Sequence, residues 1–256
     1  MREIDNFSFT IVVPAAGLGK RMGHPKLPKA LVLFRKRELF IWSISSFLEF
    51  AESVIAVIRK EQLELFLEFF RKNSFQSFKH AFQNSSLGTA EAVHIGLMHV
   101  NTEWTLVVWG DHIGASRMPP RRLLKHMDNS STDFILPLVR RIRPYVYFTQ
   151  NKVNGIMTFH ETKNGAKVVS MGISDCGVFL FRTGVIATFL ESYFEAKKDP
   201  CLAEINFLSL FGEMQKSGIT FKKVFLKDEL LTFGANSPAE LAAFELALDS
   251  EDRSER

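Results

Sequence analysis

The sequence predicts an α/β protein, with helices on both faces of a mostly parallel central sheet and a small antiparallel β lobe added to it. Three observations favour this class. Short apolar runs alternate with helical patterns over residues 1–140. After that point the chain changes to short strands separated by turn residues. The length of 256 residues, 46% of them hydrophobic and 23% charged, suits a single globular domain.

The first strand is expected at residues 9–13, where Ile11, Val12 and Val13 form a β-branched apolar run and Pro14 ends the hydrogen bonding. Similar runs predict strands at 54–58, 78–82, 104–109 and 134–139, with helices at 38–50, 61–72, 88–100 and 120–129. This alternation indicates a Rossmann-like, three-layer αβα arrangement. Ligands of such sheets gather beyond the carboxyl ends of the strands.

The second half of the chain is expected to form the antiparallel lobe. Strands are predicted at 145–149, 155–160, 167–171 and 177–181, then helices at 184–197 and 202–217 and a strand at 219–226. The pair Asn164-Gly165 is typical of a hairpin turn. Ser237, Pro238 and Glu240 predict the start of a last helix, with a capping serine and a proline at the first helical position.

Composition excludes several classes of protein. The net charge is +4, but the cations are scattered, so a nucleic-acid partner is not expected. Apolar runs stay shorter than 18 residues and the first residues lack a signal-peptide pattern, so neither a membrane span nor secretion is expected. Cys176 and Cys201 show no metal-ligand spacing, which favours free thiols and a cytoplasmic location. Nothing in the sequence indicates a particular oligomeric state.

Residues 9–31 have the features of a phosphate-binding loop. Gly17 and Gly19 have no Cβ, so backbone N–H groups can turn and approach a ligand closely. The cations that crowd behind these glycines are Lys20, Arg21, Lys26 and Lys29. Because these charges repel one another unless an anion lies among them, the loop is interpreted as a polyphosphate cradle.

Two better-known phosphate loops do not match this stretch. A P-loop requires Gly-Lys followed by Ser or Thr, whereas Gly19-Lys20 is followed by Arg21. A dinucleotide-binding G-x-G-x-x-G would need its third glycine at Met22, but the glycine comes one residue later, at Gly23.

The stretch resembles the opening of the sugar-phosphate nucleotidyltransferases. That family carries A-A-G-x-G-x-R-M followed by L-P-K-x-L, and this chain has AAGLGKRM at 15–22 and LPKAL at 27–31. The resemblance is closest to the uridylyltransferase domain that makes UDP-N-acetylglucosamine. This chain has one extra residue between the two motifs, and Lys26 follows a proline as Lys29 does. Lys26 therefore remains an alternative to Lys29 as the catalytic lysine.

Further motifs follow the family pattern in register. Residues 83–92, QNSSLGTAEA, match Q-x-x-x-L-G-T-x-x-A, whose Gln and Gly-Thr pair contact the base in that family. Gly110-Asp111 matches the family's G-D, and Gly234 and Asn236 match its G-V-N. In the family this Asp and this Asn hold Mg²⁺, and hard oxygen ligands suit that ion.

The resemblance implies a role for each matched residue. Arg21 and Lys29 are the expected catalytic residues, and Asp111 and Asn236 the expected metal ligands. Nucleotide binding is expected from Ala15, Ala16, Gly17, Gly19, Lys20, Gln83, Gly88, Thr89 and Gly110. Substrate binding is expected from Glu161, Lys163 and Asp175. Asp175 stands where the family has Asn, and the family's glycine loop corresponds to residues 144–148, which contain no glycine.

The resemblance implies a nucleotide-diphospho-sugar transferase fold in one domain. Within it, 1–140 would bind the nucleotide, 141–230 the acceptor, and 231–256 would supply a metal-completing loop and the C-terminal helix. The expected reaction transfers a nucleoside monophosphate from a triphosphate (UTP, CTP or dTTP) to a sugar-1-phosphate and releases pyrophosphate. Because of the departures at 144–148 and Asp175, two alternatives stay open: a non-sugar alcohol phosphate as acceptor, or a nucleotide-binding module without turnover.

Overall fold

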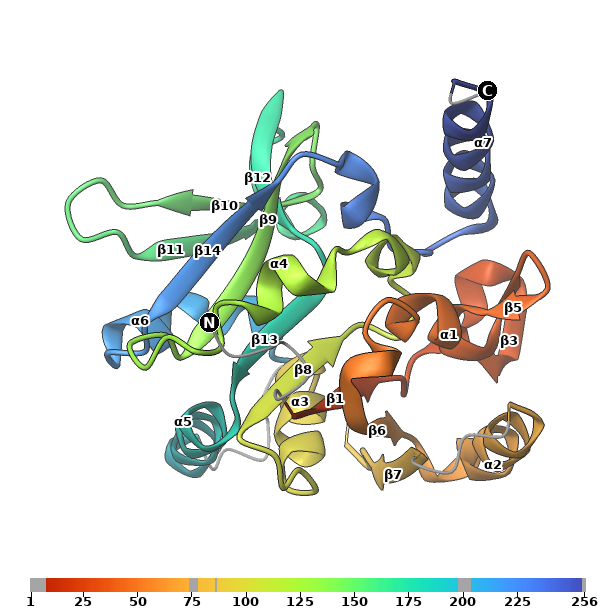
Figure 1. Ribbon diagram of the computed structural model, residues 1–256, viewed down its shortest axis with the longest axis horizontal. Coiled ribbons are helices and arrows are strands. Elements are labelled where there is room, and N and C mark those ends of the chain that lie inside the picture. Colours follow the sequence, from red (N-terminus) through yellow and green to blue (C-terminus); the bar gives the residue numbers. More distant parts are fainter. Residues whose placement is uncertain (1–7, 74–77, 86, 198–203, 255–256) are drawn as a thin grey trace.

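A ten-stranded mixed sheet runs through the molecule (Figure 1). The computed structural model describes residues 8–73, 78–85, 87–197 and 204–254. The strands follow the order β11-β10-β12-β9-β13-β8-β1-β6-β7, and β14 also pairs with β9. Their bounds are β1 (Phe9–Pro14), β6 (Ala51–Ile58), β7 (Phe78–Phe82), β8 (Trp104–Val108), β9 (Phe134–Ile142), β10 (Val146–Gln150), β11 (Met157–Glu161), β12 (Met171–Asp175), β13 (Val178–Arg182) and β14 (Phe221–Leu226).

The first four of these strands form a parallel block, and β14 pairs in parallel with β9 elsewhere in the sheet. β1 pairs in parallel with β6 and β8, and β6 pairs in parallel with β7. Ile11, Val12 and Val13 have no exposed surface, because β1 is covered on both faces. The loops after β1 and β8 therefore leave the same edge of the sheet, next to each other.

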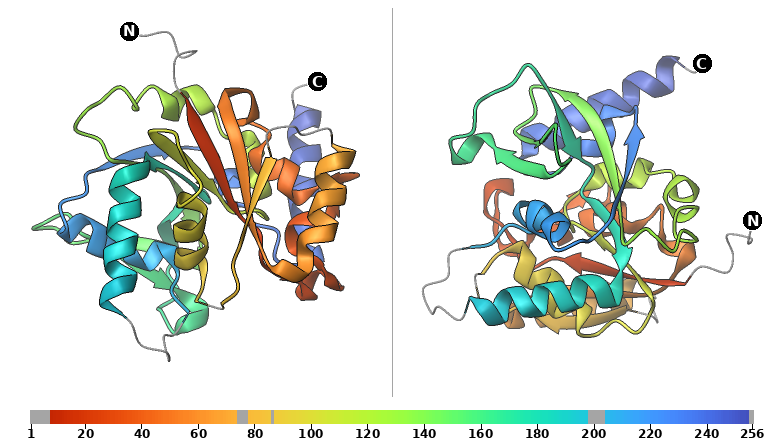
Figure 2. Two further views of the ribbon diagram at one scale, coloured as in Figure 1. Left: turned by 90° about the horizontal axis from the view of Figure 1, so that it is seen from below. Right: turned by 90° about the vertical axis from the view of Figure 1, so that its left-hand side faces the viewer.

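Helices pack on both faces, which confirms the predicted three-layer fold (Figure 2). One layer contains α1 (Leu39–Ile44), α2 (Leu63–Lys72) and α4 (Pro120–Leu124). The other contains α3 (Thr89–Leu97), α5 (Thr183–Ala196) and α6 (Phe211–Lys216). Alternate residues of β1 serve the two layers: Ile11 and Val13 pack in the first, Val12 in the second.

The antiparallel strands β10, β11 and β12 continue the same sheet beyond β9. β10 pairs with both β11 and β12, and the hairpin between β10 and β11 lies at residues 151–156. The turn chemistry predicts a hairpin at Asn164-Gly165 instead, and that prediction is wrong. Gly165 has a positive φ of 88°, but it ends a single 3₁₀ turn. The strand predicted at 167–171 also begins later than expected, because β12 occupies Met171–Asp175.

Three predicted helices are clearly shorter than expected, and one of them, predicted at 120–129, ends at Leu124. The helix expected at 202–217 consists of a 3₁₀ turn, Phe207–Leu210, and α6; residues 202 and 203 lie outside the described residues. The helix expected at 38–50 ends at Ile44 and resumes as a 3₁₀ turn at Leu48–Phe50. Phe207, Leu208 and Leu210 of the first 3₁₀ turn are buried in the core, whereas Leu48 and Phe50 of the second are only partly buried against it.

The last helix, α7 (Pro238–Ser254), packs beside the first loop and not over the main sheet. Phe244 contacts Phe34 and Phe233, in a cluster with Leu39 and Ile113. Two small antiparallel pairs, β2 (Leu18–Gly19) with β3 (His24–Pro28) and β4 (Leu33–Phe34) with β5 (Arg37–Glu38), complete this region.

Two sequence expectations concern cysteines and membrane spans. Cys176 is buried, and burial raises the pKa of its thiol. Cys201 lies outside the described residues. Among the helices of the described chain, none combines the length and the apolar character that crossing a membrane requires.

Candidate active site

A cavity of about 640 Å³ opens at the carboxyl ends of β1 and β8, where the fold predicts a ligand. It brings together most of the residues that the sequence motifs single out. The predicted residues that line it are Ala15, Ala16, Gly17, Arg21, Lys29, Gln83, Gly88, Thr89, Gly110, Asp111, Glu161, Lys163 and Asn236. Gly19, Lys20 and Asp175 are not in the lining.

Lys29 lies at the centre of this arrangement. Its ammonium group donates hydrogen bonds to the carboxylate of Asp111 and to the side-chain oxygen of Asn236, the latter at 2.8 Å. The partners are 82 and 207 residues away along the chain. Lys26, the alternative lysine, is exposed and does not line the cavity. The geometry therefore favours Lys29 for any role at this site.

Backbone hydrogen bonds hold these three side chains together. The N–H of Lys29 donates to the carbonyl of Gly17 at 2.9 Å, which ties the lysine to the first loop. The N–H of Ala235 donates to the carbonyl of Asp111 at 2.8 Å, which joins the two loops that carry the oxygen donors. At the start of α7, Ser237 accepts from the N–H of Glu240 at 3.2 Å, as the capping prediction requires.

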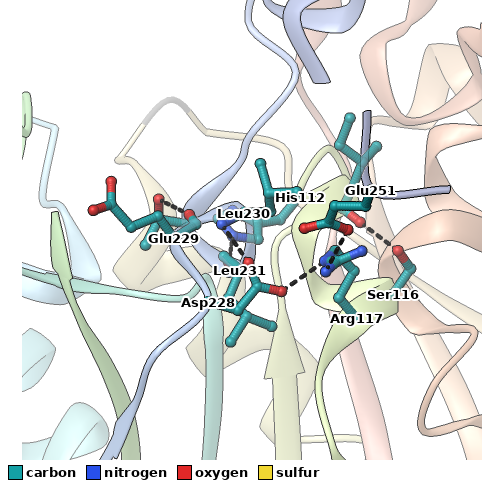
Figure 3. A network of polar contacts seen from close by, with 10 residues as sticks. His112, Ser116, Arg117, Asp228, Glu229, Leu230, Leu231 and Glu251 are labelled. Carbon is teal, nitrogen blue, oxygen red and sulfur yellow. Dashed lines mark hydrogen bonds and ion pairs between the residues drawn. The ribbon is translucent and has the colours of Figure 1, made fainter. Parts of the chain in front are cut away.

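A second network holds the same two loops from behind (Figure 3). Arg117, at the end of the 3₁₀ turn Ile113–Arg117, donates to Asp228 at 2.6 Å and pairs with Glu251 of α7 at 2.9 Å. The Nε2–H of His112 donates to the carbonyl of Leu231 at 2.8 Å. Burial lowers the pKa of His112, which keeps the ring neutral and leaves Nε2 as its donor.

The donor set matches a hard divalent cation. Asp111 supplies a carboxylate and Asn236 an amide oxygen, and both oxygens already face a positive charge in the form of the Lys29 ammonium. Within the described ranges, no three His, Cys, Asp or Glu side chains are grouped to hold a metal ion. A site with few protein ligands is typical of Mg²⁺ that is also held by substrate phosphates and water.

The first loop is supported by two residues that the sequence analysis does not identify, Arg59 and Gln62. The carbonyl of Ala16 accepts from Arg59 Nε at 3.1 Å and from Gln62 Nε2 at 3.2 Å, and Gln62 is 3% exposed. Arg59 also lines the cavity and adds a cation beside the first loop. These contacts span more than 40 residues of sequence. A local sequence pattern therefore cannot predict these two hydrogen bonds.

Another part of the cavity wall is formed by Gln83, Gly88 and Thr89 together with Glu204, Asn206 and Leu208. The hydroxyl oxygen of Thr89 accepts from the N–H of Phe207 at 2.9 Å. Gly88 has a φ of 91°, and a Cβ there would lie 2.5 Å from the carbonyl oxygen of Ile205. The glycine is therefore required by the close approach of the second chain segment.

Near the antiparallel strands, Glu161 is buried and forms an ion pair with Lys163 at 2.8 Å. Tyr145 lies beside them in the lining, a residue that the sequence prediction of site residues omitted. Although 45% of Tyr145 is exposed, loss of water around its hydroxyl, next to Asp175 and Asp111, raises its pKa to about 12. A hydrogen bond with the Asn236 side chain acts in the opposite direction.

Asp175 is placed differently from the other predicted substrate ligands. Its carboxylate accepts from the N–H of Gly177 at 2.8 Å and is buried behind the cavity wall. Burial raises the pKa of the Asp175 carboxyl. Its observed contact supports the turn before β13.

The fold and the cavity define an α/β protein with a polar cavity at the carboxyl edge of its parallel strands. The chain belongs to the family described as the MobA-like NTP transferase domain, whose model matches residues 11–175. The match covers the first loop, the Gln83 segment and Asp111. A comparison by sequence with curated proteins finds no match.

Solved structures share the fold at low identity. A putative glucose-1-phosphate thymidylyltransferase from Bacillus anthracis is 16% identical, with a TM-score of 0.70 over 94% of each chain. The inositol-1-phosphate CTP transferase from T. maritima is 18% identical, with a TM-score of 0.71 over 94% of each chain. A nucleoside-diphosphate-sugar pyrophosphorylase from Vibrio cholerae is 19% identical, with a TM-score of 0.63 over 91% of this chain and 98% of that one.

Proposed function

We propose that the protein is a Mg²⁺-dependent nucleotidyltransferase. It would transfer a nucleoside monophosphate from a pyrimidine triphosphate to a sugar-1-phosphate, or to a similar phosphorylated acceptor, and release pyrophosphate. The observation that carries the proposal is the meeting of Lys29, Asp111 and Asn236 beside the first loop. Membership of an NTP transferase family supports the reaction class.

In this mechanism a phosphate oxygen of the acceptor attacks the α-phosphorus in line, forming one P–O bond while the bond to the leaving pyrophosphate breaks. The protein contributes positioning and charge neutralisation. Arg21 would hold the departing pyrophosphate, and Lys29 would neutralise charge that grows on the α-phosphate. Asp111 and Asn236 would hold Mg²⁺, which supplies charge neutralisation across the phosphates when bound.

Binding of a metal–nucleotide has a consequence for Lys29. A second cation between Asp111 and Asn236 would repel the ammonium group. Lys29 would then be free to turn toward phosphates held by the first loop, to which its backbone is tied through the carbonyl of Gly17. The ion pair with Asp111 thus keeps the lysine in the cavity before the nucleotide arrives.

The acceptor end supports a phosphorylated polyol. Glu161 presents a buried carboxylate for hydroxyl groups, and Lys163 presents an exposed ammonium for a phosphate. The resemblance to the N-acetylglucosamine-1-phosphate uridylyltransferases makes a sugar-1-phosphate the first candidate. The division into a nucleotide half (1–140), an acceptor lobe (141–230) and a metal-completing end (231–256) remains part of this proposal.

The test is a pyrophosphate-release assay. UTP, CTP and dTTP are each combined with glucose-1-phosphate, N-acetylglucosamine-1-phosphate and inositol-1-phosphate. We expect release with at least one pair, loss of release in EDTA, and recovery with Mg²⁺. Asp111→Ala should abolish release without unfolding the protein.

A second candidate is a nucleotide-binding module without turnover. It is favoured by the glycine-free residues 144–148 and by the position of Asp175 outside the cavity. Tight binding of Mg²⁺–nucleotide, with no pyrophosphate from any pair, would support it over the enzyme.

A further inference from the structure

We infer that Glu91 selects a uracil or thymine base by fixing the side-chain amide of Gln83 with its oxygen toward the ligand. The inference rests on the proposed function, since it names the nucleotide that the cavity would take. Glu91 lies at an unspecified position of the Q-x-x-x-L-G-T-x-x-A pattern, so no motif assigns it a role.

The contacts of Gln83 determine which way its amide points. Its nitrogen donates to the carbonyl of Gly88 at 2.9 Å and to a carboxylate oxygen of Glu91 at 2.8 Å. An amide nitrogen has two hydrogens, and both are used. Reversing the amide would place its oxygen against two other oxygens, neither of which has a proton to give. The orientation is therefore set by its neighbours.

Glu91 is itself held in place. Its second carboxylate oxygen accepts a hydrogen bond from the hydroxyl of Ser85. Glu91 is the acidic residue of the first turn of α3, where the helix dipole favours a negative charge. Gln83 is 8% exposed, and its backbone N–H donates to the carbonyl of Ile58 at 2.8 Å. The Gln83 side-chain amide is therefore held in one orientation before a ligand binds.

What remains for a ligand is one hydrogen-bond acceptor, the side-chain oxygen of Gln83. A neighbouring donor is available as well, because Thr89 accepts from Phe207 and keeps its hydroxyl proton. Ring nitrogen N3 distinguishes the pyrimidines: in uracil and thymine it carries a proton, and in cytosine it is an acceptor. Cytosine N3 opposite the fixed oxygen would bring two lone pairs together, which a buried site penalises.

The test compares UTP with CTP in the wild type and in Glu91→Gln. We expect the wild type to prefer UTP in kcat/KM by on the order of tenfold or more. Glu91→Gln lowers the cost of reversing the Gln83 amide, because a glutamine at 91 can also donate to the amide oxygen, and only the Gly88 carbonyl then still opposes the reversed orientation. The UTP-to-CTP ratio should then fall by on the order of tenfold, mainly through faster reaction with CTP. Ser85→Ala should shift the ratio in the same direction by less.

The matched control is Glu64→Gln, which removes the same charge from the first turn of α2, away from the cavity. It should leave the ratio unchanged. Calorimetric binding of UMP and CMP gives a readout that does not require turnover. A folded Glu91→Gln protein with the wild-type ratio would overturn the inference, as would a wild type that prefers CTP. If the wild type releases no pyrophosphate but binds UMP over CMP, the proposed enzyme fails and the inference stands.

Discussion

Lys29 occupies the place where two oxygen donors face each other, and this single contact explains several features of the site. The ammonium satisfies the Asp111 carboxylate, which would otherwise be an unpaired charge at the edge of the core. It also orients the Asn236 amide with its oxygen toward the cation. In the proposed function, the same two oxygens that accept from Lys29 would be the ligands of the metal.

Replacing Lys29 should separate its two roles. We predict that Lys29→Ala keeps the fold and lowers turnover by about 10²–10³, the range found when a transition-state charge contact is removed. Lys26→Ala is the control, because Lys26 is exposed and outside the cavity lining. Pyrophosphate release measures both. If Lys29→Ala keeps full activity, Lys29 is not the catalytic lysine.

Tyr145 gives a prediction for alkaline stability. Its pKa is about 12 in the folded protein and about 10 in the unfolded chain, so between these values the folded state holds the proton more firmly. The contribution is fully present below pH 10 and is lost as pH rises toward 12. We predict that urea midpoints fall more between about pH 9 and about pH 11 in the wild type than in Tyr145→Phe. Parallel pH profiles would contradict the shift.

At the scale of elements, the site depends on how the segment after Asp111 is joined to the segment before Asn236. Arg117 connects them by contacting Asp228, which caps the 3₁₀ turn Glu229–Thr232, and Glu251 of α7 (Figure 3). The N–H of Gly114 adds a backbone bond to the carbonyl of Phe233 at 3.0 Å. The two loops thus form one unit behind the cavity.

We predict that Arg117→Met lowers kcat by on the order of 10–10², because a small displacement of Asn236 from Asp111 misplaces the reacting groups. Stability should fall by about 1–3 kcal/mol through loss of hydrogen bonds to charged groups. Arg35→Met is the matched control: its side chain is similarly exposed, 32% against 27%. Arg35 pairs only with Glu245 and Asp249 of α7 among the ion pairs of the described residues.

Steady-state kinetics and urea unfolding distinguish the outcomes. Arg35→Met should keep kcat close to that of the wild type. If the two variants lose equal activity, the connection between the loops is not what positions Asn236.

The elements that sequence predicts well are those whose pattern is local. β1, β6 and β8 contain buried apolar runs, and these strands and the partly exposed β7 each lie within a few residues of their predicted ranges. The break between the strands predicted at 145–149 and 155–160 is confirmed as the hairpin loop, whereas Asn164-Gly165, which has the stronger turn chemistry, has no strand partner across it. The helix predicted at 202–217 is shorter because apolar periodicity does not distinguish a 3₁₀ turn from an α-helix.

At the scale of the whole molecule, the sequence motifs predict which residues meet in the cavity but not the contacts that hold those residues in position. Asp111 and Asn236 were expected at one site because each follows a recognisable pattern. The sequence does not predict Arg59, Tyr145 or Arg117 at the site. Arg59 and Arg117 contact residues 43 and 111 positions away, and Tyr145 meets its neighbours only because the fold brings distant segments together. Long-range contacts between unlike segments leave no periodic trace in the sequence.

Assembly of the site from three distant segments predicts that a ligand stabilises the entire domain. Mg²⁺–UTP should raise the melting temperature, with a gain of about 2.7 kcal/mol when the ligand is present at 100 times its Kd. Asn236→Ala should reduce this shift at the same ligand concentration, since it removes one of the two oxygen donors. Differential scanning fluorimetry with and without Mg²⁺ measures the effect, and an equal shift in both proteins would argue against a role for Asn236.

The central claim is that Lys29, Asp111 and Asn236 surround one magnesium–triphosphate. The most direct measurement is a crystal structure with Mg²⁺ and a non-hydrolysable UTP analogue. We predict a metal at about 2.0–2.1 Å from oxygens of Asp111 and Asn236, with the Lys29 ammonium moved onto a phosphate. A nucleotide bound in the cavity while Lys29 still bridges Asp111 and Asn236, and the metal lies elsewhere, would contradict the account.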